Sequence, residues 1–188
     1  MARCARITSR CKSQRGEYMA EARELTGPEG MKKIGELIGE IRFAMLTTLA
    51  ADGTLDSRPM ATQKTEFDGV LWFLTGAATR KTEEIADDAN VSLIYADPGD
   101  ASYVTVKGHA RVLNDRKKIS ELWNAMYKAW FPGGEDDPNI RVLRVDVTQA
   151  EYWEASDSKI VRGIKYLAAA ATKGAVDVGE HGTMNVGR

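Results

Sequence analysis

Two adjacent cations, Arg80 and Lys81, stand at the start of a predicted helix in the stretch TGAATRKTEEI, residues 75–85. The first turn of a helix is the positive end of its dipole, where acidic residues are favoured over basic ones. Backbone N–H groups there lack partners within the helix, so with the two cations and a threonine hydroxyl they could bind a phosphate. The alternative is that Arg80 and Lys81 pair with Glu84, because residues three or four apart lie together on a helix. The spacing alone leaves both interpretations open.

Three further polar side chains, those of Arg58, Gln63 and Lys64, lie in a strand-like run at residues 55–67. An Asp-Gly turn separates this run from VLWFLT, so the two segments are predicted to pair as neighbouring strands. That pairing would bring the polar side chains to the end of the sheet that carries the two cations. A phosphate monoester carries a charge of about −1.5 to −2, which such a group of cations would match.

Motifs for other kinds of nucleotide or catalytic chemistry are absent from the sequence. It contains no P-loop, no Gly-x-Gly-x-x-Gly turn and no His-Glu-x-x-His motif. Of the two histidines, His109 lies on the polar side of a predicted strand and His181 lies near the C-terminus. The two cysteines, Cys4 and Cys11, lie near the N-terminus. We therefore predict no metal site and identify no catalytic residue, so difficult chemistry would have to come from a bound cofactor.

The hydrophobic pattern predicts six strands, at residues 43–50, 55–67, 70–75, 91–96, 103–113 and 140–154. Asp52-Gly53 between the first two runs is a strong hairpin motif. Tight turns of this kind imply antiparallel pairing, and a sheet of this size with alternating faces commonly closes into a barrel. The predicted fold class is therefore mainly β with helices (α+β), built as a six-stranded antiparallel barrel.

Four helices are predicted around these strands. Residues 28–41 place apolar side chains at helical spacing, and a second helix is expected at about 79–88. A third, at about 116–130, follows an Asn-Asp pair that can cap its start. A fourth is expected near 158–171, before a polar tail.

The length of 188 residues predicts one domain. Residues 1–16 carry five basic residues, no acidic residue and no apolar run, so they do not form a secretory signal. We interpret residues 1–27 as a disordered basic leader, either native or derived from cloning or a misplaced start codon. Met19 and Met31 are alternative starts. Residues 28–188 are then the folded domain, with its C-terminal helix and tail.

The overall composition argues against several classes of partner. A net charge of −1 gives no electrostatic basis for binding nucleic acid. No stretch of the sequence approaches the roughly 18 apolar residues that a membrane span needs. Cysteines confined to the leader leave the folded part without a disulfide, which suits a cytoplasmic protein.

The chain resembles the FMN-binding split-barrel proteins related to pyridoxamine 5′-phosphate oxidase in three stretches: FAMLTTLAADGTLDSRPMATQ, DGVLWFLTGAATRKTEEI and VSLIYADPGDASYVTVKGHARVLNDRKKI. Within that family it is most similar to the bacterial general stress protein 26 group. ELWNAMYKAWFPGGEDDPNIRVLRVDVTQAEYWE and the tail EHGTMNV also resemble this group. The resemblance covers about residues 31–188 and implies a split β-barrel that binds FMN.

The resemblance also implies a homodimer with two FMN sites at the subunit interface. Arg58 and the backbone that follows it would lie along the flavin, and Gln63 stands about where oxidase relatives carry a lysine. Trp153 would approach the flavin from the partner chain; its alternative role is packing. The resemblance places Thr79, Arg80 and Lys81 at the phosphate of the cofactor. The full set of residues that it assigns to the cofactor is Arg58, Pro59, Met60, Ala61, Gln63, Phe73, Leu74, Thr75, Thr79, Arg80, Lys81 and Trp153.

One departure from the B6 oxidases limits the functional hypothesis. Trp153 is followed by EASDSKIVRGIKYL, without the Arg-x-His element that grips the substrate phosphate in those enzymes, so pyridoxamine phosphate oxidation is not expected. The first hypothesis is an FMN-dependent oxidoreductase-like stress protein, with NAD(P)H or a small molecule as its reaction partner. The second is a protein that binds or senses a flavin without turnover. The third is a relative that uses FAD, deazaflavin F420 or haem, of which haem fits least because neither histidine lies in a ligand motif.

Overall fold

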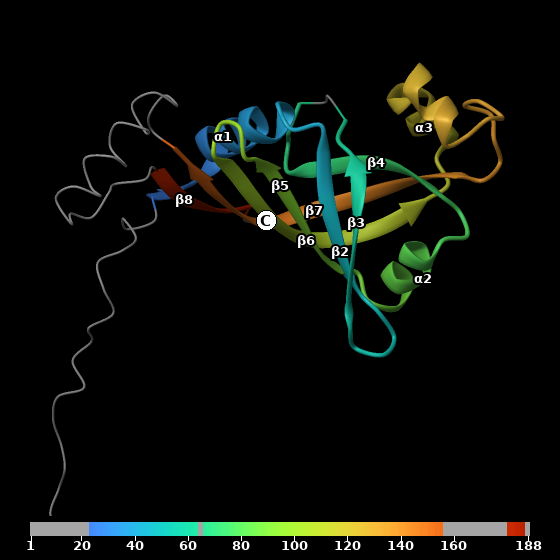
Figure 1. Cartoon of the computed structure of the whole chain (residues 1–188), viewed down its shortest axis with the longest axis horizontal. Helices are drawn as coiled ribbons and strands as arrows, with labels where there is room; N and C mark the ends of the chain where they lie inside the picture. Colours follow the sequence, from blue (N-terminus) through green and yellow to red (C-terminus); the bar gives the residue numbers. More distant parts are fainter. Residues whose placement is uncertain (1–22, 64–65, 156–179, 187–188) are drawn as a thin grey trace, which may run out of the picture.

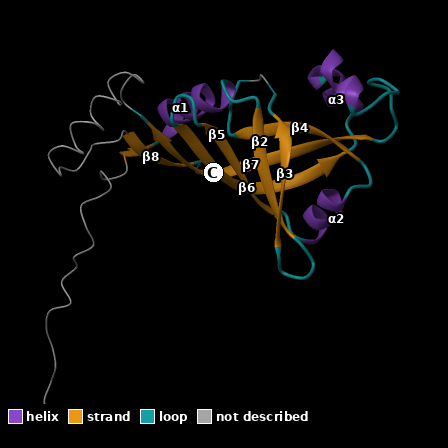
Figure 2. Cartoon of the chain, viewed as in Figure 1, coloured by secondary structure: helices purple, strands orange, loops and turns teal. Residues whose placement is uncertain are grey.

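A computed structural model describes residues 23–63, 66–155 and 180–186 of the chain. One curved sheet of eight strands forms its centre, with a helix over one face and shorter helices at one end (Figures 1 and 2). The first part of the predicted leader, up to residue 22, and the predicted helix at 158–171 lie outside the described residues.

The strands run in the order β1-β8-β7-β6-β5-β2-β3, and β4 pairs with β7 beside that path. Neighbouring strands are antiparallel, except that β1 and β8 are parallel. The strands are β1 (Arg23–Leu25), β2 (Phe43–Leu49), β3 (Leu55–Ala61), β4 (Val70–Gly76), β5 (Asn90–Asp97), β6 (Ser102–Leu113), β7 (Ile140–Glu154) and β8 (Glu180–Asn185).

The hairpin between β2 and β3 is confirmed. The strands pair from Phe43 opposite Ala61 to Leu49 opposite Leu55. Gly53 has a positive φ of 82°, a conformation that glycine adopts without steric cost. The Asp52 carboxylate accepts hydrogen bonds from the backbone N–H and the hydroxyl of Thr54, at 3.0 Å and 2.6 Å. Local turn chemistry therefore fixes this hairpin.

The predicted pairing of β3 with β4 is wrong. β4 lies along the first half of β7 instead, from Val70 opposite Asp146 to Gly76 opposite Ile140. The turn at Gly69 starts this pairing, because its carbonyl accepts a hydrogen bond from the Val147 N–H at 2.9 Å. β3 also ends at Ala61, whereas the sequence predicted a strand as far as residue 67.

The α+β class, with a mostly strand structure, is confirmed, but the six-stranded closed barrel is not. The six predicted strands correspond to β2–β7, while β8 continues the sheet from the second half of β7 and β1 pairs with β8. Within the described residues no ladder joins β3 to β4, so the sheet is not closed. β1 also places residues 23–25, part of the predicted leader, in the sheet.

Of the three predicted helices that fall within the described residues, the first two agree with the sequence and the third does not. α1 (Gly27–Gly39) and α2 (Arg80–Asp87) match their predicted ranges closely. The single helix expected at 116–130 is instead α3 (Arg116–Leu122) followed by a 3₁₀-helix, η1 (Ala125–Ala129). The Asn124 side chain accepts a hydrogen bond from the Met126 N–H at 3.0 Å, which caps η1 and separates it from α3.

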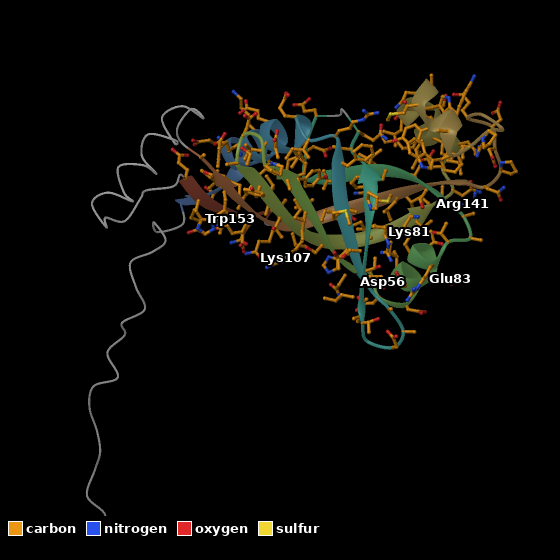
Figure 3. All side chains as sticks on the ribbon, viewed as in Figure 1. Asp56, Lys81, Glu83, Lys107, Arg141 and Trp153 are labelled. Carbon is orange, nitrogen blue, oxygen red and sulfur yellow. The ribbon has the colours of Figure 1, made fainter. Side chains whose placement is uncertain are left out.

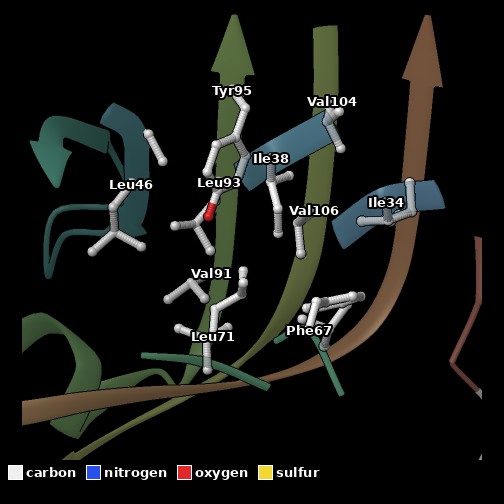
Figure 4. Close-up of a cluster of buried hydrophobic side chains, with 14 of the residues drawn as sticks. Ile34, Ile38, Leu46, Phe67, Leu71, Val91, Leu93, Tyr95, Val104 and Val106 are labelled. Carbon is white, nitrogen blue, oxygen red and sulfur yellow. The ribbon is translucent and has the colours of Figure 1, made fainter. Parts of the chain in front are cut away.

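The main hydrophobic core lies between α1 and the inner face of the sheet (Figure 4). Ile34 and Ile38 project from α1 into this core, in which Leu93 of β5 and Val106 of β6 are fully buried. Phe67, in the segment that leads into β4, and Leu71, on β4 itself, close the same core. A second, smaller cluster packs α3 and η1 against β4 and β7 and contains Leu74, Ile119, Leu122, Tyr127, Ile140 and Val142.

Candidate functional site

The start of α2 keeps two backbone donors unused. Thr79 lies just before the helix, and its carbonyl accepts hydrogen bonds from the N–H groups of Thr82 (2.9 Å) and Glu83 (3.2 Å). The Thr79 N–H donates to the Thr82 hydroxyl at 3.0 Å. Among the described residues, the backbone N–H groups of Arg80 and Lys81 have no hydrogen-bond partner. These two N–H groups are therefore free hydrogen-bond donors at the positive end of the helix dipole.

A buried carboxylate, that of Glu84, organises the charges around this helix. Its Oε2 accepts hydrogen bonds from the Thr48 hydroxyl at 2.6 Å and from Arg58 Nη2 at 2.8 Å. Arg80 Nε lies 3.0 Å from the other oxygen, Oε1, so the helical pair between Arg80 and Glu84 that the sequence left open is present. Asp56 Oδ2 lies 2.7 Å from Arg80 Nη2 and 3.8 Å from Arg58 Nη2. Two arginines thus alternate with two carboxylates.

Lys81 differs from its neighbours because no described carboxylate pairs with it. Its side chain is half-buried, and this burial, together with repulsion from Arg58, lowers the pKa of its ammonium group. Attraction by Glu84 opposes the shift without cancelling it. The Glu84 carboxyl shows the usual effect of partners, since the hydrogen bonds from Thr48 and Arg58 hold its pKa below the ordinary glutamate value although burial opposes them. The fold therefore disfavours the charged form of Lys81.

The three predicted residues of β4 are buried in different surroundings. Phe73 lies in the main core and Leu74 in the second cluster, so both side chains are occupied by packing. Thr75 is also buried, but its hydroxyl has no hydrogen-bond partner among the described residues. An unsatisfied buried hydroxyl costs about 1–3 kcal/mol, so Thr75 has a polar atom available for a ligand.

The predicted residues of β3 and the segment after it lie beside the second cluster. Pro59 is exposed, Met60 is buried in the main core and Ala61 packs against the second cluster. The Gln63 amide donates a hydrogen bond to the hydroxyl of Tyr127, a residue of η1 that the sequence did not single out. Lys64 lies outside the described residues.

Trp153 lies at the opposite end of β7 from the α2 cluster, and Figure 3 shows it far from Lys81 and Asp56. Its ring stacks on His181 of β8, with ring centroids 4.8 Å apart and planes 10° from parallel. The structure therefore brings Arg58, Thr79, Arg80 and Lys81 together and leaves Trp153 apart from them within one chain.

Sequence reasoning missed Asp56 and Thr48 and did not assign Glu84 to the site. One pattern could have found Asp56: residues two apart on a strand point to the same face, as Asp56 and Arg58 do. Thr48 stands opposite Asp56 in the β2–β3 register, so the hairpin motif would have located it as well.

An exposed apolar strip crosses the outer face of the sheet on β2, β5 and β6. Met45 pairs with Ile94 in the register, and their side chains are 41% and 45% exposed. Phe43 and Tyr103 extend the strip along the neighbouring row, and Tyr103 pairs with Trp153. Contiguous apolar surface of this kind commonly marks a contact with another molecule.

The described residues contain neither a metal-binding cluster nor a membrane-spanning helix. Nowhere in residues 23–63, 66–155 and 180–186 do three or more His, Cys, Asp or Glu side chains gather in a way that could hold a metal ion. The helices in the same ranges are all too short or too polar to span a membrane.

Comparison with known proteins shows the family to which the chain belongs. Residues 29–177 match the family model described as pyridoxamine 5′-phosphate oxidase like. The protein bli-3 of Neurospora crassa is 31% identical over 121 residues, which cover 59% of this chain and 58% of bli-3. The chain thus aligns with little more than half the length of that relative.

Two solved structures share the fold. A general stress FMN/FAD binding protein from Xanthomonas citri has a TM-score of 0.61 and 26% identity, and the match covers 70% of this chain and 93% of that one. A Jannaschia protein described as a candidate general stress protein 26 has a TM-score of 0.67 and 22% identity, covering 85% and 99% of the two chains. The second likeness concerns the fold alone.

Proposed function

Because this chain belongs to the pyridoxamine 5′-phosphate oxidase-like family of general stress proteins, we propose that it binds FMN and acts as a flavin-dependent oxidoreductase. The phosphate of FMN lies, in this proposal, at the start of α2. The observation that carries it is Lys81, a half-buried cation without an ion-pair partner in the described part of the chain. A cation whose pKa is lowered by burial and by a like charge, and which no carboxylate pairs with, is a candidate ligand-binding group.

The residues present at this position fit a phosphate group. The free N–H groups of Arg80 and Lys81 offer directed donors, and the Lys81 ammonium offers a positive charge beside them. The unpartnered hydroxyl of Thr75, on the strand that leads into this turn, fits a polar ligand atom. Arg58 and Arg80 add charge, although both are paired with carboxylates in this structure.

The flavin supplies the redox chemistry when it is bound. The residues of this chain bind and orient it: Lys81 and the N–H groups of α2 fix the phosphate, and Arg58 lies on the adjacent strand. Gln63, fixed by its hydrogen bond to Tyr127, presents an amide next to the end of β3. No general acid or base is assigned.

We also propose that the protein is a homodimer in which each cofactor site takes residues from both chains. In this proposal Trp153 comes from a second copy, because Figure 3 shows it far from Lys81 of its own chain. The apolar strip that contains Met45, Ile94 and Tyr103 supports such a contact, because its burial would remove these exposed side chains from water.

The test is a flavin titration of the purified protein and of the double variant Arg80→Ala with Lys81→Ala. We expect the variant to bind FMN about 30-fold more weakly, because each hydrogen bond to a charged group contributes about 1.5–3 kcal/mol. The affinity for riboflavin, which lacks the phosphate, should differ little between the wild type and the double variant. The matched control is Lys32→Ala with Lys117→Ala, which removes two exposed cations elsewhere. Equal FMN affinity in the wild type and the double variant would refute the phosphate position.

A binding or sensing role without turnover is the second candidate. The observation that favours it is that Arg58, Arg80, Asp56 and Glu84 are paired with one another, so none of these four side chains is free to act as a general acid or base. NAD(P)H added to the flavin-loaded protein separates the two: bleaching of the flavin absorbance supports the oxidoreductase, and an unchanged spectrum supports the sensor. Chromatography of the released cofactor decides between FMN and FAD.

A further inference from the structure

We propose that Asp56 is an internal competitor of the phosphate, because its carboxylate holds the Arg80 guanidinium that the phosphate would use. The inference rests on the proposed function, since it concerns the same anion position at the start of α2. A phosphate reaches the Nη2 atom of Arg80 only by displacing Asp56. Asp56 therefore weakens cofactor binding, although it lies among the residues that form the site.

The geometry of Arg80 is the first argument. Its side chain is 67% exposed and turns back to Asp56 and Glu84, with Nη2 at 2.7 Å from Asp56 Oδ2. The surface hollow that it borders has a volume of about 300 Å³, and Asp52, Glu83 and Asp87 also line it. These acidic side chains disfavour an anion in the hollow, and Arg80 in this orientation directs its Nη2 and Nε atoms to carboxylates rather than to a ligand.

Charge balance is the second argument. Arg58 and Arg80 carry two positive charges, and Asp56 and Glu84 carry two negative ones, within a single chain of ion pairs. The network is neutral, which leaves Lys81 and the helix N–H groups as the positive elements near the phosphate position. Freeing Arg80 from Asp56 would restore one cation to the site.

Burial separates the roles of the two carboxylates. Glu84 is buried and also accepts hydrogen bonds from the Thr48 hydroxyl and from Arg58. Its removal would therefore disturb both the β2–β3 hairpin and α2. Asp56 has a 28% exposed side chain, and its closest ion pair is with the exposed Arg80. An exposed pair shifts an equilibrium by up to about fivefold, so a dianionic phosphate can displace Asp56.

The chain offers a matched control in Glu83, which Figure 3 shows on α2 near Asp56 and Lys81. Glu83 is an exposed acid of the first helical turn, and it forms no ion pair within the described residues. Glu83→Gln removes the same charge from the same neighbourhood without releasing an arginine. The difference between Asp56→Asn and Glu83→Gln therefore measures competition for Arg80 apart from general repulsion.

The experiment compares wild type, Asp56→Asn and Glu83→Gln by fluorescence titration with FMN and with riboflavin. Inorganic phosphate alone is titrated through its effect on the thermal unfolding midpoint at constant ionic strength. We expect Asp56→Asn to tighten FMN and phosphate binding about three- to fivefold, and Glu83→Gln less than twofold. Riboflavin affinity should not change. In an Arg80→Ala background, Asp56→Asn should have no more effect than Glu83→Gln.

The outcomes separate the two proposals. If wild type binds FMN and phosphate but Asp56→Asn tightens neither beyond Glu83→Gln, the competition is refuted and the flavin site stands. If the effect of Asp56→Asn persists without Arg80, the competition is also refuted. If wild type binds neither FMN nor phosphate, both proposals fail. Should Asp56→Asn not fold, Asp56→Ser provides the same comparison.

Discussion

The α2 end of the molecule and the Trp153 end hold their predicted site residues in different ways. At the α2 end, Arg58 and Arg80 are fixed by ion pairs to Glu84 and Asp56. At the other end, Trp153 is fixed by stacking on His181 and lies next to Tyr103, a 41% exposed residue of the apolar strip. One end is organised by charge and the other by aromatic contact, and β7 extends between them.

The two ends also differ in what each could still bind. The charged end satisfies its own arginines internally but keeps Lys81 half-buried without a carboxylate among the described residues. At the aromatic end the Trp153 ring stacks on His181, but neighbouring side chains such as Tyr103 remain exposed. A charge without a partner suits an anion, whereas an exposed apolar strip suits another protein surface. We therefore expect substitutions at the two ends to act on different measurements.

The largest effect is expected from Glu84→Ala. It leaves the Arg58 guanidinium partly buried without its main carboxylate and removes the acceptor to which the Thr48 hydroxyl donates, although that hydroxyl still accepts from Arg58. Removal of one partner from a buried ion pair destabilises a protein by about 3 kcal/mol or more. Chemical denaturation at neutral pH measures this loss in the free energy of unfolding. A loss below about 1 kcal/mol would mean that the pair behaves as a surface pair.

The pH dependence of the same variant gives a second check. The folded pKa of Glu84 lies below its ordinary value, so its contribution is present above the ordinary glutamate pKa of 4.5 and disappears as the pH falls through the lower folded value. The stability gap between wild type and Glu84→Ala should therefore be constant near neutral pH and narrow in acid. A gap that widens in acid would contradict the assignment.

The next largest effect tests whether the two ends meet across a dimer. Trp153→Ala and the double variant Arg80→Ala with Lys81→Ala should each weaken FMN binding, the double variant by about 30-fold. In a mixed dimer, one site combines both defects, and the other combines an intact α2 end with an intact Trp153. Mixing the two variants should therefore restore tight binding to about half the sites of each mixed dimer. No recovery would contradict a site shared between chains.

Lys81→Met should have a smaller effect, in the stabilising direction. Because burial lowers the pKa of Lys81, its charged form costs free energy in the fold at neutral pH. Methionine fills similar space without the charge, so the ligand-free protein should gain about 1 kcal/mol while FMN binding weakens. Wild-type stability should also rise with pH toward the ordinary lysine pKa of 10.5, and the variant should lack this rise. A destabilised variant would show that the charge has an unrecognised partner.

The smallest effect is expected from Glu154→Ala, near the Trp153 end. Glu154 pairs with Lys33 of α1, and both side chains are about 30% exposed, at 31% and 30%. Ion pairs with this exposure contribute at most about 1 kcal/mol. In chemical denaturation, the loss in the free energy of unfolding caused by Glu154→Ala should be a third or less of the loss caused by Glu84→Ala. Equal losses for the two variants would remove the distinction between the two ends.

Much of the fold follows from local sequence patterns. The alternation of apolar residues located β2 and β4–β7 closely, and Asp52-Gly53 fixed the hairpin. β8 could not be found this way: the run EHGTMN has little apolar character, and it forms a strand because Gly182 packs on the Tyr152 ring and Met184 enters the core. The break between α3 and η1 depended on one side-chain cap, which a helical periodicity does not show.

The candidate site divides in the same way. The sequence placed Arg80 and Lys81 at a helix start because capping and periodicity are local, and it identified Glu84 as one alternative partner of both. The structure pairs Glu84 with Arg80 and also with Arg58, while Lys81 has no described partner. Spacing could not decide this outcome, because Arg58 comes from a strand 26 residues away from Glu84.

The sequence alone located β2, β4–β7, α1 and α2, the turn of the first hairpin, and the two cations that begin α2. These features depend on neighbours within a few residues, so side-chain periodicity and turn chemistry suffice to specify them. Only the tertiary structure decided that β4 joins β7, that Asp56 takes Arg80, and that Trp153 lies apart from Lys81. These depend on burial and on contacts between distant segments, which lower the free energy only once the sheet has formed.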